Sequence, residues 1–264
     1  MSAVAGYPQP GNSFDELPGV ALAAESVAAF EVRTLVEDTP ALRPQDIIGP
    51  ADNRHAVDDT RLLPWRFICH LVLEDQHGRL FGGTGWLAGP RTVYTAAHNL
   101  LYAAQNYEAR RVVVVPGRNG ANGTPFGSAV AAGFEVHPQW RGSGRAEFDC
   151  GVVWLPQPVP ASFGWFGFRA ESDAALAAGS VFCSGYPQDK GQTQWFDSSR
   201  IHRPGPQLLA YGLDTLPGHS GSPVFRSEST GPVAVGVHVY GNRIENLGVR
   251  ITAGIDQQLK QWWR

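Results

Sequence analysis

The chain has 264 residues, 43% of them hydrophobic, and a formal net charge of −3. That length and composition can bury a large core, as one domain or as two fused halves. The small negative charge offers no basic field for nucleic acid or an anionic membrane. No apolar run approaches the roughly 18 residues that a transmembrane helix requires. We therefore expect a globular protein that binds neither nucleic acid nor membrane.

The segment 1–46 differs in composition from the rest of the chain. It is rich in Ala, Pro, Glu and Asp, and no Lys or Arg precedes Arg33. Without a basic start and a compact apolar core, it is not recognisable as a secretory signal. Two interpretations stay open for this segment, a disordered tail and a propeptide.

From about residue 64, short strand-like runs alternate with Gly, Pro and Asn. Runs of this length with frequent turn signals predict an all-β fold, an antiparallel sandwich or barrel. They lie at 67–73, 85–88, 91–95, 112–115, 150–155, 181–183 and 233–239. The stretch 255–262 is typical of a helix, with Ile255, Leu259 and Trp262 on one face. A break in the strand pattern at 137–147 indicates a linker between halves, and the aromatic run 165–168 is expected in the core of the second half.

The cysteines and histidines show no metal-ligand pattern. Cys69, Cys150 and Cys183 include no CxxC pair, which argues against a zinc site or a disulfide framework. One disulfide bond stays open, although three buried thiols fit a reducing compartment better. Calcium binding by Asp58 and Asp59 also stays open, without a recognisable ligand loop. The histidines outside the proposed site are scattered without the spacing typical of metal ligands: His55, His70, His77, His137 and His202. We expect no metal and no cofactor.

Three stretches carry the groups that activate a serine. A serine hydroxyl becomes a useful nucleophile when an imidazole takes its proton, a carboxylate holds the imidazole and N–H groups await the oxyanion. His98 follows a strand-like run, Asp149 precedes another, and Ser220 lies between Gly218 and Gly221. Alone, each has an ordinary structural explanation. Together, in the order His, Asp, Ser, they predict a catalytic triad.

These stretches resemble the chymotrypsin-fold serine proteases, and among them the bacterial glutamyl endopeptidases. The resemblance runs from Ile47 almost to the end of the chain. It includes IIGPADNRHAVDDT, GTGWLAGPRTVYTAAH, FDCGVVWL, WFGF, GYPQD, QWF, YGLDTLPGHSGSPVF, VGVHVYG and RIT. It implies two six-stranded antiparallel β-barrels, with a C-terminal helix and the active site between them. The expected division is a segment 1–46, a first barrel at 47–142, and a second barrel with the terminal helix at 143–264.

The resemblance also implies a role for each candidate residue. Ser220 would be the nucleophile, His98 the general base and then acid, Asp149 the residue that orients His98, and the N–H groups of Gly218 and Ser220 the oxyanion hole. The expected activity is hydrolysis of protein or peptide substrates through an acyl-enzyme, by a monomer. The family suggests secretion. A binding module that has lost catalysis is the alternative, disfavoured because every catalytic side chain is present.

Two features of the predicted specificity pocket point to different substrates. Asp214 occupies the position where trypsin-like enzymes carry the aspartate that attracts Arg or Lys; its ordinary explanation is a carboxylate facing outward from a loop. His238 and Thr215 match the histidine and hydroxyl by which glutamyl endopeptidases bind a substrate carboxylate. We favour cleavage after Glu, with Asp weaker, because His238 would line the same pocket and gives no advantage to a cation.

The residue before the nucleophile departs from the trypsin-like pattern. Trypsin-like zymogens become active when a new terminal amine pairs with an aspartate at this position, and here it is His219. In glutamyl endopeptidases the freed amino terminus can instead assist the specificity pocket. Since 47–50 matches the start of mature family members and Asp46 precedes it, we predict removal of residues 1–46 by cleavage between Asp46 and Ile47.

Overall fold

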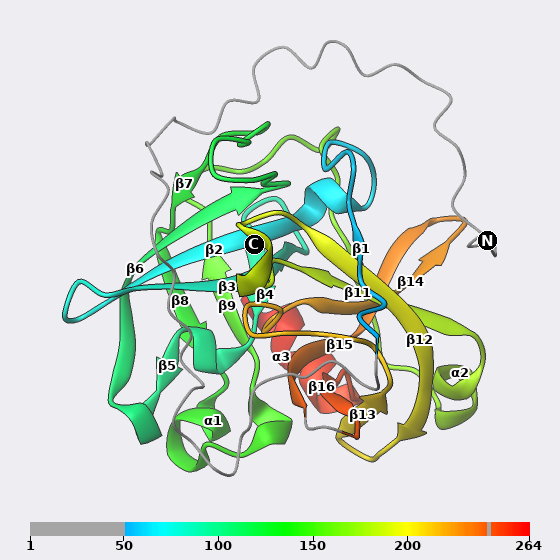
Figure 1. Ribbon diagram of the computed structural model, residues 1–264. Helices are drawn as coiled ribbons and strands as arrows, with labels where there is room; N and C mark the ends of the chain where they lie inside the picture. The colour runs from blue at the N-terminus through cyan, green and yellow to red at the C-terminus, as the bar shows by residue number, and fades with distance from the viewer. Residues whose placement is uncertain (1–50, 242–243) are drawn as a thin grey trace.

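The computed structural model describes residues 51–241 and 244–264, which form two β-sheets (Figure 1). Asp46 and Ile47 lie outside the described residues. The six longer strands of the first sheet are β2 (Ile68–Asp75), β3 (Leu80–Leu87), β4 (Thr92–Thr95), β6 (Tyr107–Pro116), β8 (Gly133–Val136) and β9 (Gly151–Trp154). Those of the second are β11 (Ser180–Gly185), β12 (Trp195–Pro204), β13 (Leu208–Tyr211), β14 (Pro223–Glu228), β15 (Gly231–Gly241) and β16 (Asn246–Arg250). Two-residue strands complete each sheet: β5 (Leu101–Tyr102) and β7 (Ala129–Val130) in the first, β1 (His55–Ala56) and β10 (Gly167–Phe168) in the second.

The second sheet closes on itself. Its strands pair in the order β12, β11, β14, β15, β16 and β13, and β13 pairs back with β12. The closed barrel therefore has six strands. The two-residue strands β1 and β10 are additional, and they pair with β12 and β15. Closure of this kind leaves no long unpaired edge.

The first sheet closes through one continuous segment, 129–136. Its strands pair in the order β6, β2, β3, β4, β9 and β8. At the far end, β7 pairs with β6 and the Ala131 N–H donates to the Val112 carbonyl (2.8 Å). The next residue, Ala132, donates to the Trp154 carbonyl in β9 (2.8 Å). The expected all-β fold with two barrel-like sheets is confirmed.

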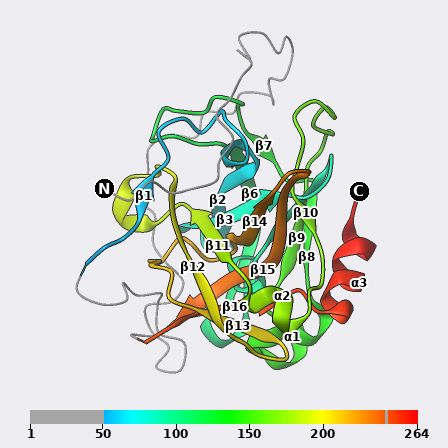
Figure 2. The same cartoon turned by 90° about the vertical axis from the view of Figure 1, so that its right-hand side faces the viewer.

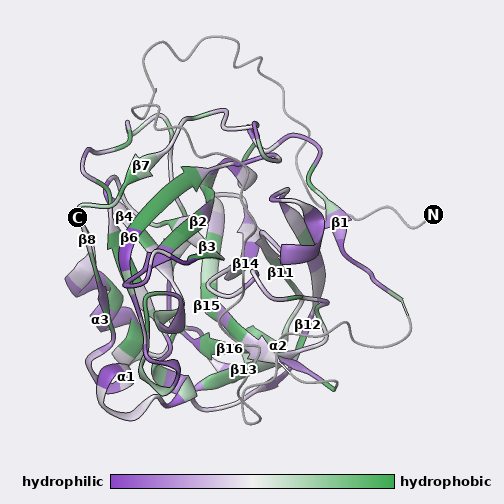
Figure 3. Cartoon of the chain, turned by 60° about the vertical axis from the view of Figure 1, so that its left-hand side comes forward, coloured by the Kyte–Doolittle hydropathy of each residue, from purple (hydrophilic) through white to green (hydrophobic). Residues whose placement is uncertain are grey.

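The strands predicted from the sequence are mostly buried, although the short buried strands β13 and β16 were not predicted. In β2, seven of eight residues are buried, including the polar His70 and Asp75, so both faces of the strand are covered. The apolar stretches of β2 and β6 stand out in Figure 3. By contrast, β12 contains Asp, His, two Arg and two Ser, is mostly half-buried or exposed, and was not predicted from the sequence.

The boundary between the barrels differs from the expected one. Strand β9, which begins at Gly151, belongs to the first sheet, so that sheet extends past residue 142 to Trp154. The region expected as a linker instead forms α1 (Pro138–Ser143) and η4 (Ala146–Phe148). In addition, β1 pairs with β12 and so belongs to the second sheet, although it lies near the start of the described chain.

The aromatic run 165–168 packs between the barrels rather than inside the second. Phe166 is 1% exposed, and its ring contacts Trp86 of the first sheet (centroids 5.6 Å apart) and Phe225 of the second (5.1 Å). Phe168 contacts Tyr94 (5.5 Å). Complete burial of one such ring stabilises the fold by roughly 1.5–3 kcal/mol, so this run holds the two barrels together.

The predicted C-terminal helix is present as α3 (Ala253–Trp262), with Ile255, Leu259 and Trp262 buried as expected. It covers the first barrel, although the second precedes it in the chain. Tyr94 donates to the Leu259 carbonyl (2.5 Å), and the Trp154 indole donates to the Trp262 carbonyl (2.9 Å). Figure 2 shows α3 beside β8 and β9. The other short helices are α2 (Asp173–Ala177), η1 (Trp65–Phe67), η2 (Ala97–Asn99), η3 (Ala103–Gln105) and η5 (Gln188–Lys190).

Cys69, Cys150 and Cys183 are free thiols buried within the two barrels. Burial raises the pKa of each thiol above its ordinary value, so the thiolate forms are disfavoured. Among the described residues, the helices are too short or too polar for any to cross a membrane.

Candidate active site

His98 and Asp149 meet where β4 and β9 lie side by side. His98 is in η2, just after β4, and Asp149 directly follows η4. The Asp149 Oδ2 lies 2.6 Å from His98 Nδ1, and its Oδ1 accepts the backbone N–H of His98 (2.8 Å). Because a carboxylate only accepts, Nδ1 is the protonated ring nitrogen. In the neutral imidazole, Nε2 is then the acceptor.

Ser220 is held beside this pair by its backbone. Its carbonyl accepts from the Thr84 N–H (2.9 Å) and from Asn99 Nδ2 (2.9 Å), and Asn99 directly follows His98. Gly221 has a φ of +89°, and a Cβ there would lie 2.1 Å from the Thr84 carbonyl oxygen. Glycine is therefore required beside the serine. The three residues predicted as a triad lie in one site, contributed by both barrels.

The hydroxyl of Ser220 does not bond to His98 in this structure. Its Oγ donates to the Val239 carbonyl (3.2 Å). Nε2 of His98 is buried and makes no hydrogen bond within the described part of the chain. His98 thus carries a buried acceptor nitrogen whose lone pair is unused in the described chain, and the next residue, Asn99, bonds to Ser220. Such bonds are often long or absent until substrate binds.

The loop 216–221, here called the oxyanion loop, is fixed by bonds to its carbonyls. The Gln188 N–H donates to the Pro217 carbonyl (2.8 Å), and Thr84 Oγ1 donates to the Gly218 carbonyl (2.8 Å). Gly218 has a φ of +104°, and a Cβ there would lie 2.3 Å from the Tyr186 carbonyl oxygen. The sequence analysis identified Gly218 but not Thr84, Asn99 or Gln188, because a backbone or amide donor leaves no motif.

His238 is fully buried, and its Nδ1 lies 2.7 Å from the Tyr211 hydroxyl. Burial, with the nearby His219 and His98, lowers the pKa of His238 well below 6.5, so the ring is neutral. Burial raises the pKa of the Tyr211 hydroxyl well above 10, which keeps its proton available. Within the described residues, His238 Nε2 and Thr215 Oγ1 are both buried without a hydrogen-bond partner.

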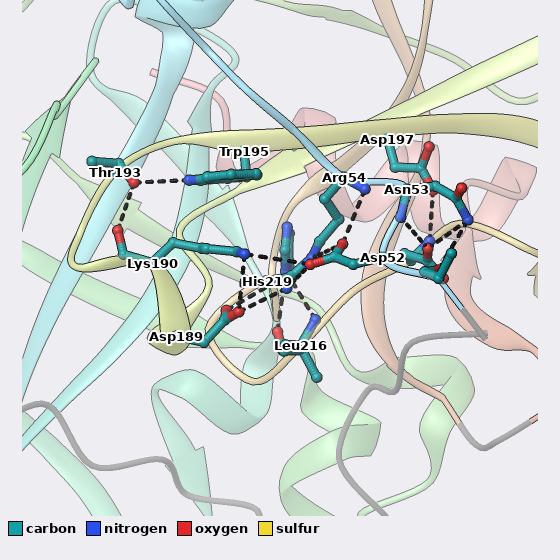
Figure 4. A network of polar contacts seen from close by, with 12 residues as sticks. Asp52, Asn53, Arg54, Asp189, Lys190, Thr193, Trp195, Asp197, Leu216 and His219 are labelled. Atoms are coloured by element: carbon teal, nitrogen blue, oxygen red, sulfur yellow. Dashed lines mark hydrogen bonds and ion pairs between the residues drawn. The ribbon is translucent and has the colours of Figure 1, made fainter. Parts of the chain in front are cut away.

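Asp214 is buried rather than facing outward from a loop. It is 1% exposed, and its Oδ2 accepts the backbone N–H (2.8 Å) and the side-chain Nδ2 (2.9 Å) of Asn53. Its own N–H donates to Asp197 Oδ2 (2.7 Å). Asn53 and Asp197 are labelled in Figure 4. The carboxylate that a trypsin-like preference would use is therefore engaged in anchoring the chain just before β1.

The residues considered for metal binding do not cluster. No group of three or more His, Cys, Asp or Glu side chains within 51–241 and 244–264 is arranged to hold a metal ion. Asp59 instead pairs with Arg61 (2.9 Å).

Comparison with known proteins now decides the family. A model of the trypsin-like peptidase domain matches residues 83–237. The chain is 35% identical over 236 residues to a glutamyl endopeptidase of Bacillus licheniformis, a match that covers 85% of this chain and 72% of the relative. This chain belongs to the glutamyl endopeptidase family of trypsin-like serine peptidases. As a serine endopeptidase, it acts on protein or peptide substrates.

This peptidase is also similar to a second curated protein and to a solved structure. A protein of Bacillus subtilis named extracellular metalloprotease is 31% identical over 231 residues, which cover 86% of this chain and 73% of that protein. A solved Glu endopeptidase in complex with MPD superposes with a TM-score of 0.72 at 27% identity, over 82% of this chain and 98% of that one. The likeness to the solved structure extends over both barrels.

Proposed function

We propose that Ser220 is the nucleophile of this peptidase, His98 its general base and then acid, and Asp149 the carboxylate that orients His98. The observation that carries the proposal is the double contact of Asp149 with the ring and the backbone of His98. It leaves Nε2 as an acceptor beside Ser220. Rotation about the Cα–Cβ bond of Ser220 would transfer its hydroxyl from the Val239 carbonyl to that nitrogen.

The reaction then follows from these positions. Nε2 of His98 takes the proton of Ser220 while Oγ attacks the scissile carbonyl carbon. The N–H groups of Gly218 and Ser220 donate hydrogen bonds to the oxyanion. In comparable sites each such donor lowers the barrier by about 3–4 kcal/mol. His98 returns its proton to the leaving amine, which breaks the C–N bond and leaves an acyl-enzyme. In the second half-reaction, His98 takes a proton from water, whose oxygen attacks the carbonyl carbon of the acyl-enzyme. The C–O bond to Ser220 then breaks, His98 returns the proton to Oγ, and the acid product leaves.

We further propose that the peptidase prefers glutamate before the scissile bond, with aspartate weaker. The support is the pair of buried polar atoms without a partner, His238 Nε2 and Thr215 Oγ1. When the Tyr211 hydroxyl donates to Nδ1, the proton of the neutral His238 ring resides on Nε2. Two buried donors are then available to one substrate carboxylate. Burial of these donors without a partner costs free energy, and the hydrogen bonds to the bound carboxylate offset that cost. Aspartate is one methylene shorter and reaches these donors less well, so its kcat/KM should be lower by about 10-fold or more.

A panel of chromogenic peptides that differ only in that residue tests both proposals. We expect rates in the order Glu, Asp, Gln and then Lys. Ser220→Ala should abolish turnover and labelling by a fluorophosphonate. A chain that is folded but unlabelled would instead be a binding module, and faster cleavage after Lys or Arg would assign specificity to Asp214.

Processing between Asp46 and Ile47 also remains our proposal. The acidic residue before the bond fits the proposed preference. Asn53, six residues after Ile47, contacts Asp214, which adjoins Thr215. N-terminal sequencing of active enzyme should find Ile47 first. Full activity with Met1 retained would exclude a need for processing.

A further inference from the structure

We propose that Arg54 is a positioning residue for the oxyanion loop. Its guanidinium anchors the turn η5, and that turn orients the peptide that carries the Gly218 N–H. The inference rests on the proposed roles of Ser220 and Gly218, and it assigns to a side chain the task that a freed terminal amine performs in trypsin-like zymogens.

The first link joins Arg54 to η5. Its side chain is 1% exposed, and it donates from Nη1 to Asp189 Oδ1 (3.0 Å) and from Nη2 to Asp189 Oδ2 (2.7 Å). The same guanidinium also donates from Nε and Nη2 to the two oxygens of Asp52 (2.9 and 2.8 Å). Figure 4 shows this arrangement, with Lys190 beside both carboxylates. Two bidentate, charge-assisted contacts fix the guanidinium in orientation as well as position.

The charges in this cluster compensate one another. Burial by itself would raise the pKa of Asp189, but its bonds with Arg54 and the charges of Arg54 and Lys190 lower it below the ordinary value. The carboxylate is therefore ionised at neutral pH. A buried guanidinium requires such partners because desolvation of an unpaired charge is costly.

The second link joins η5 to the oxyanion loop. Gln188, next to Asp189, donates its backbone N–H to the Pro217 carbonyl (2.8 Å). That carbonyl and the N–H of Gly218 belong to one planar trans peptide, so they point in opposite directions. The bond from Gln188 therefore sets the direction of the Gly218 N–H. A displaced η5 would turn this donor away from the oxyanion.

His219 adds a bond within the oxyanion loop itself. Burial, followed by the positive charge of Arg54, lowers the pKa of His219 to about 4, so its ring is neutral at working pH. His219 Nδ1 lies 3.1 Å from both the N–H and the carbonyl oxygen of Leu216, so the neutral ring makes one bond within the oxyanion loop in either tautomer. Burial contributes more to this neutral state than Arg54 does, so Arg54 acts on the oxyanion loop through η5 and Pro217.

The chain contains a matched control. Arg61 makes the same local bonds to Asp59 that Arg54 makes to Asp52: from its backbone N–H (2.9 Å), from Nε (2.9 Å) and from Nη2 (3.0 Å). Its side chain, however, is 69% exposed. Comparison of Arg54→Gln with Arg61→Gln therefore separates loss of the contact with Asp189 from loss of an Asp-x-Arg turn.

The test is steady-state kinetics on the full chain with a glutamyl chromogenic peptide. Arg54→Gln should lower kcat by about 10- to 100-fold with KM changed less than about threefold, because misplacement of a catalytic donor by about 1 Å costs up to about 100-fold. Affinity for a glutamyl peptide aldehyde, whose serine adduct places an oxygen in the oxyanion hole, should fall in parallel. Arg61→Gln should change neither value.

Three further variants keep the outcome decisive even where Arg54→Gln lowers stability. Asp189→Asn should reproduce the loss of kcat, and the double variant should lose no more than about threefold beyond either single one, since the two residues act as a pair. Arg54→Lys, which keeps the charge but not the fork, should be intermediate. Equal kcat in wild type and Arg54→Gln, or equal losses in Arg54→Gln and Arg61→Gln, would overturn the inference. Absence of turnover and of fluorophosphonate labelling in wild type would instead overturn the proposed function, and the inference with it.

Discussion

Asp149 contacts His98 twice, once at the ring nitrogen Nδ1 (2.6 Å) and once at the backbone N–H (2.8 Å), with a different carboxylate oxygen each time. Both oxygens must therefore be acceptors. This requirement distinguishes a carboxylate from the isosteric amide of asparagine, which offers one acceptor and one donor.

Asp149→Asn should therefore lower kcat by about 10⁴-fold, the magnitude known for this change in trypsin. The backbone N–H of His98 claims the amide oxygen, so the amide NH₂ faces Nδ1 and moves the ring proton to Nε2. That nitrogen can then no longer accept from Ser220. Steady-state kinetics checks the loss. Asp75→Asn, a buried carboxylate that pairs with Arg79 at the β2–β3 turn, should keep kcat near wild type.

Thr215→Val should lower kcat/KM for a glutamyl substrate by about 10- to 100-fold, as expected for a lost hydrogen bond to a charged group. The ratio of Glu to Gln cleavage should fall with it. The free energy of unfolding should be unchanged or higher, since Oγ1 has no hydrogen-bond partner in the described chain and its removal breaks no hydrogen bond there.

The control for this change is Thr60→Val. Thr60 is also buried, but its hydroxyl donates to the Gly117 carbonyl. Loss of that bond should lower the free energy of unfolding by about 1–3 kcal/mol while leaving the Glu to Gln ratio intact. An unchanged ratio in Thr215→Val would remove Thr215 from the specificity pocket.

Gly221→Ala should destabilise the fold more than Gly78→Ala. Both residues have positive φ, +89° and +76°, which costs alanine about 1–2 kcal/mol. A Cβ at Gly78 meets nothing within 4 Å, whereas one at Gly221 would lie 2.1 Å from the Thr84 carbonyl oxygen. Overpacking adds about 1–3 kcal/mol. Urea unfolding measures the difference, and equal losses would show that the backbone at Ser220 yields easily.

His70→Gln should weaken the dependence of stability on pH. Burial and the charge of Arg118 lower the pKa of His70 to about 3. From about pH 6.5 down to about 3, the unfolded chain binds a proton there that the native chain does not. Stability therefore falls as pH falls, with this histidine contributing up to about 1.4 kcal/mol per unit. His219, with a pKa of about 4, contributes in the same direction.

Chemical unfolding at several pH values between 5 and 7 measures this slope. Glutamine keeps an acceptor for Arg118, which contacts His70 Nδ1 at 3.2 Å, so the variant should fold. His77 is exposed at the turn after β2, and His77→Gln should leave the slope unchanged. An identical slope in His70→Gln and wild type would mean that His70 takes up protons equally in both states.

Patterns within short segments of the sequence were sufficient to predict several strands, the C-terminal helix and the turn at Ser220. The largely apolar runs 67–73 and 150–155 predict buried strands, because successive side chains of a strand point to opposite faces and apolar residues on both faces must be covered. The spacing of Ile255, Leu259 and Trp262 predicts α3. Glycines on both sides of Ser220 indicate a turn that other residues cannot form, which the φ values of Gly218 and Gly221 bear out. Each of these features is marked by the types and spacing of residues within one short segment, and so it can be predicted from the sequence alone.

Tertiary structure alone decided the contacts between distant polar groups. That Asp214 anchors Asn53, that Arg54 reaches Asp189, and that α3 covers the first barrel all depend on which strands pair and where the chain crosses between barrels. A carboxylate at Asp214 is equally consistent with an exposed loop, a cation pocket or a buried anchor. Its role follows from the donors that folding brings to it, and donors more than 100 residues away leave no trace in the local sequence.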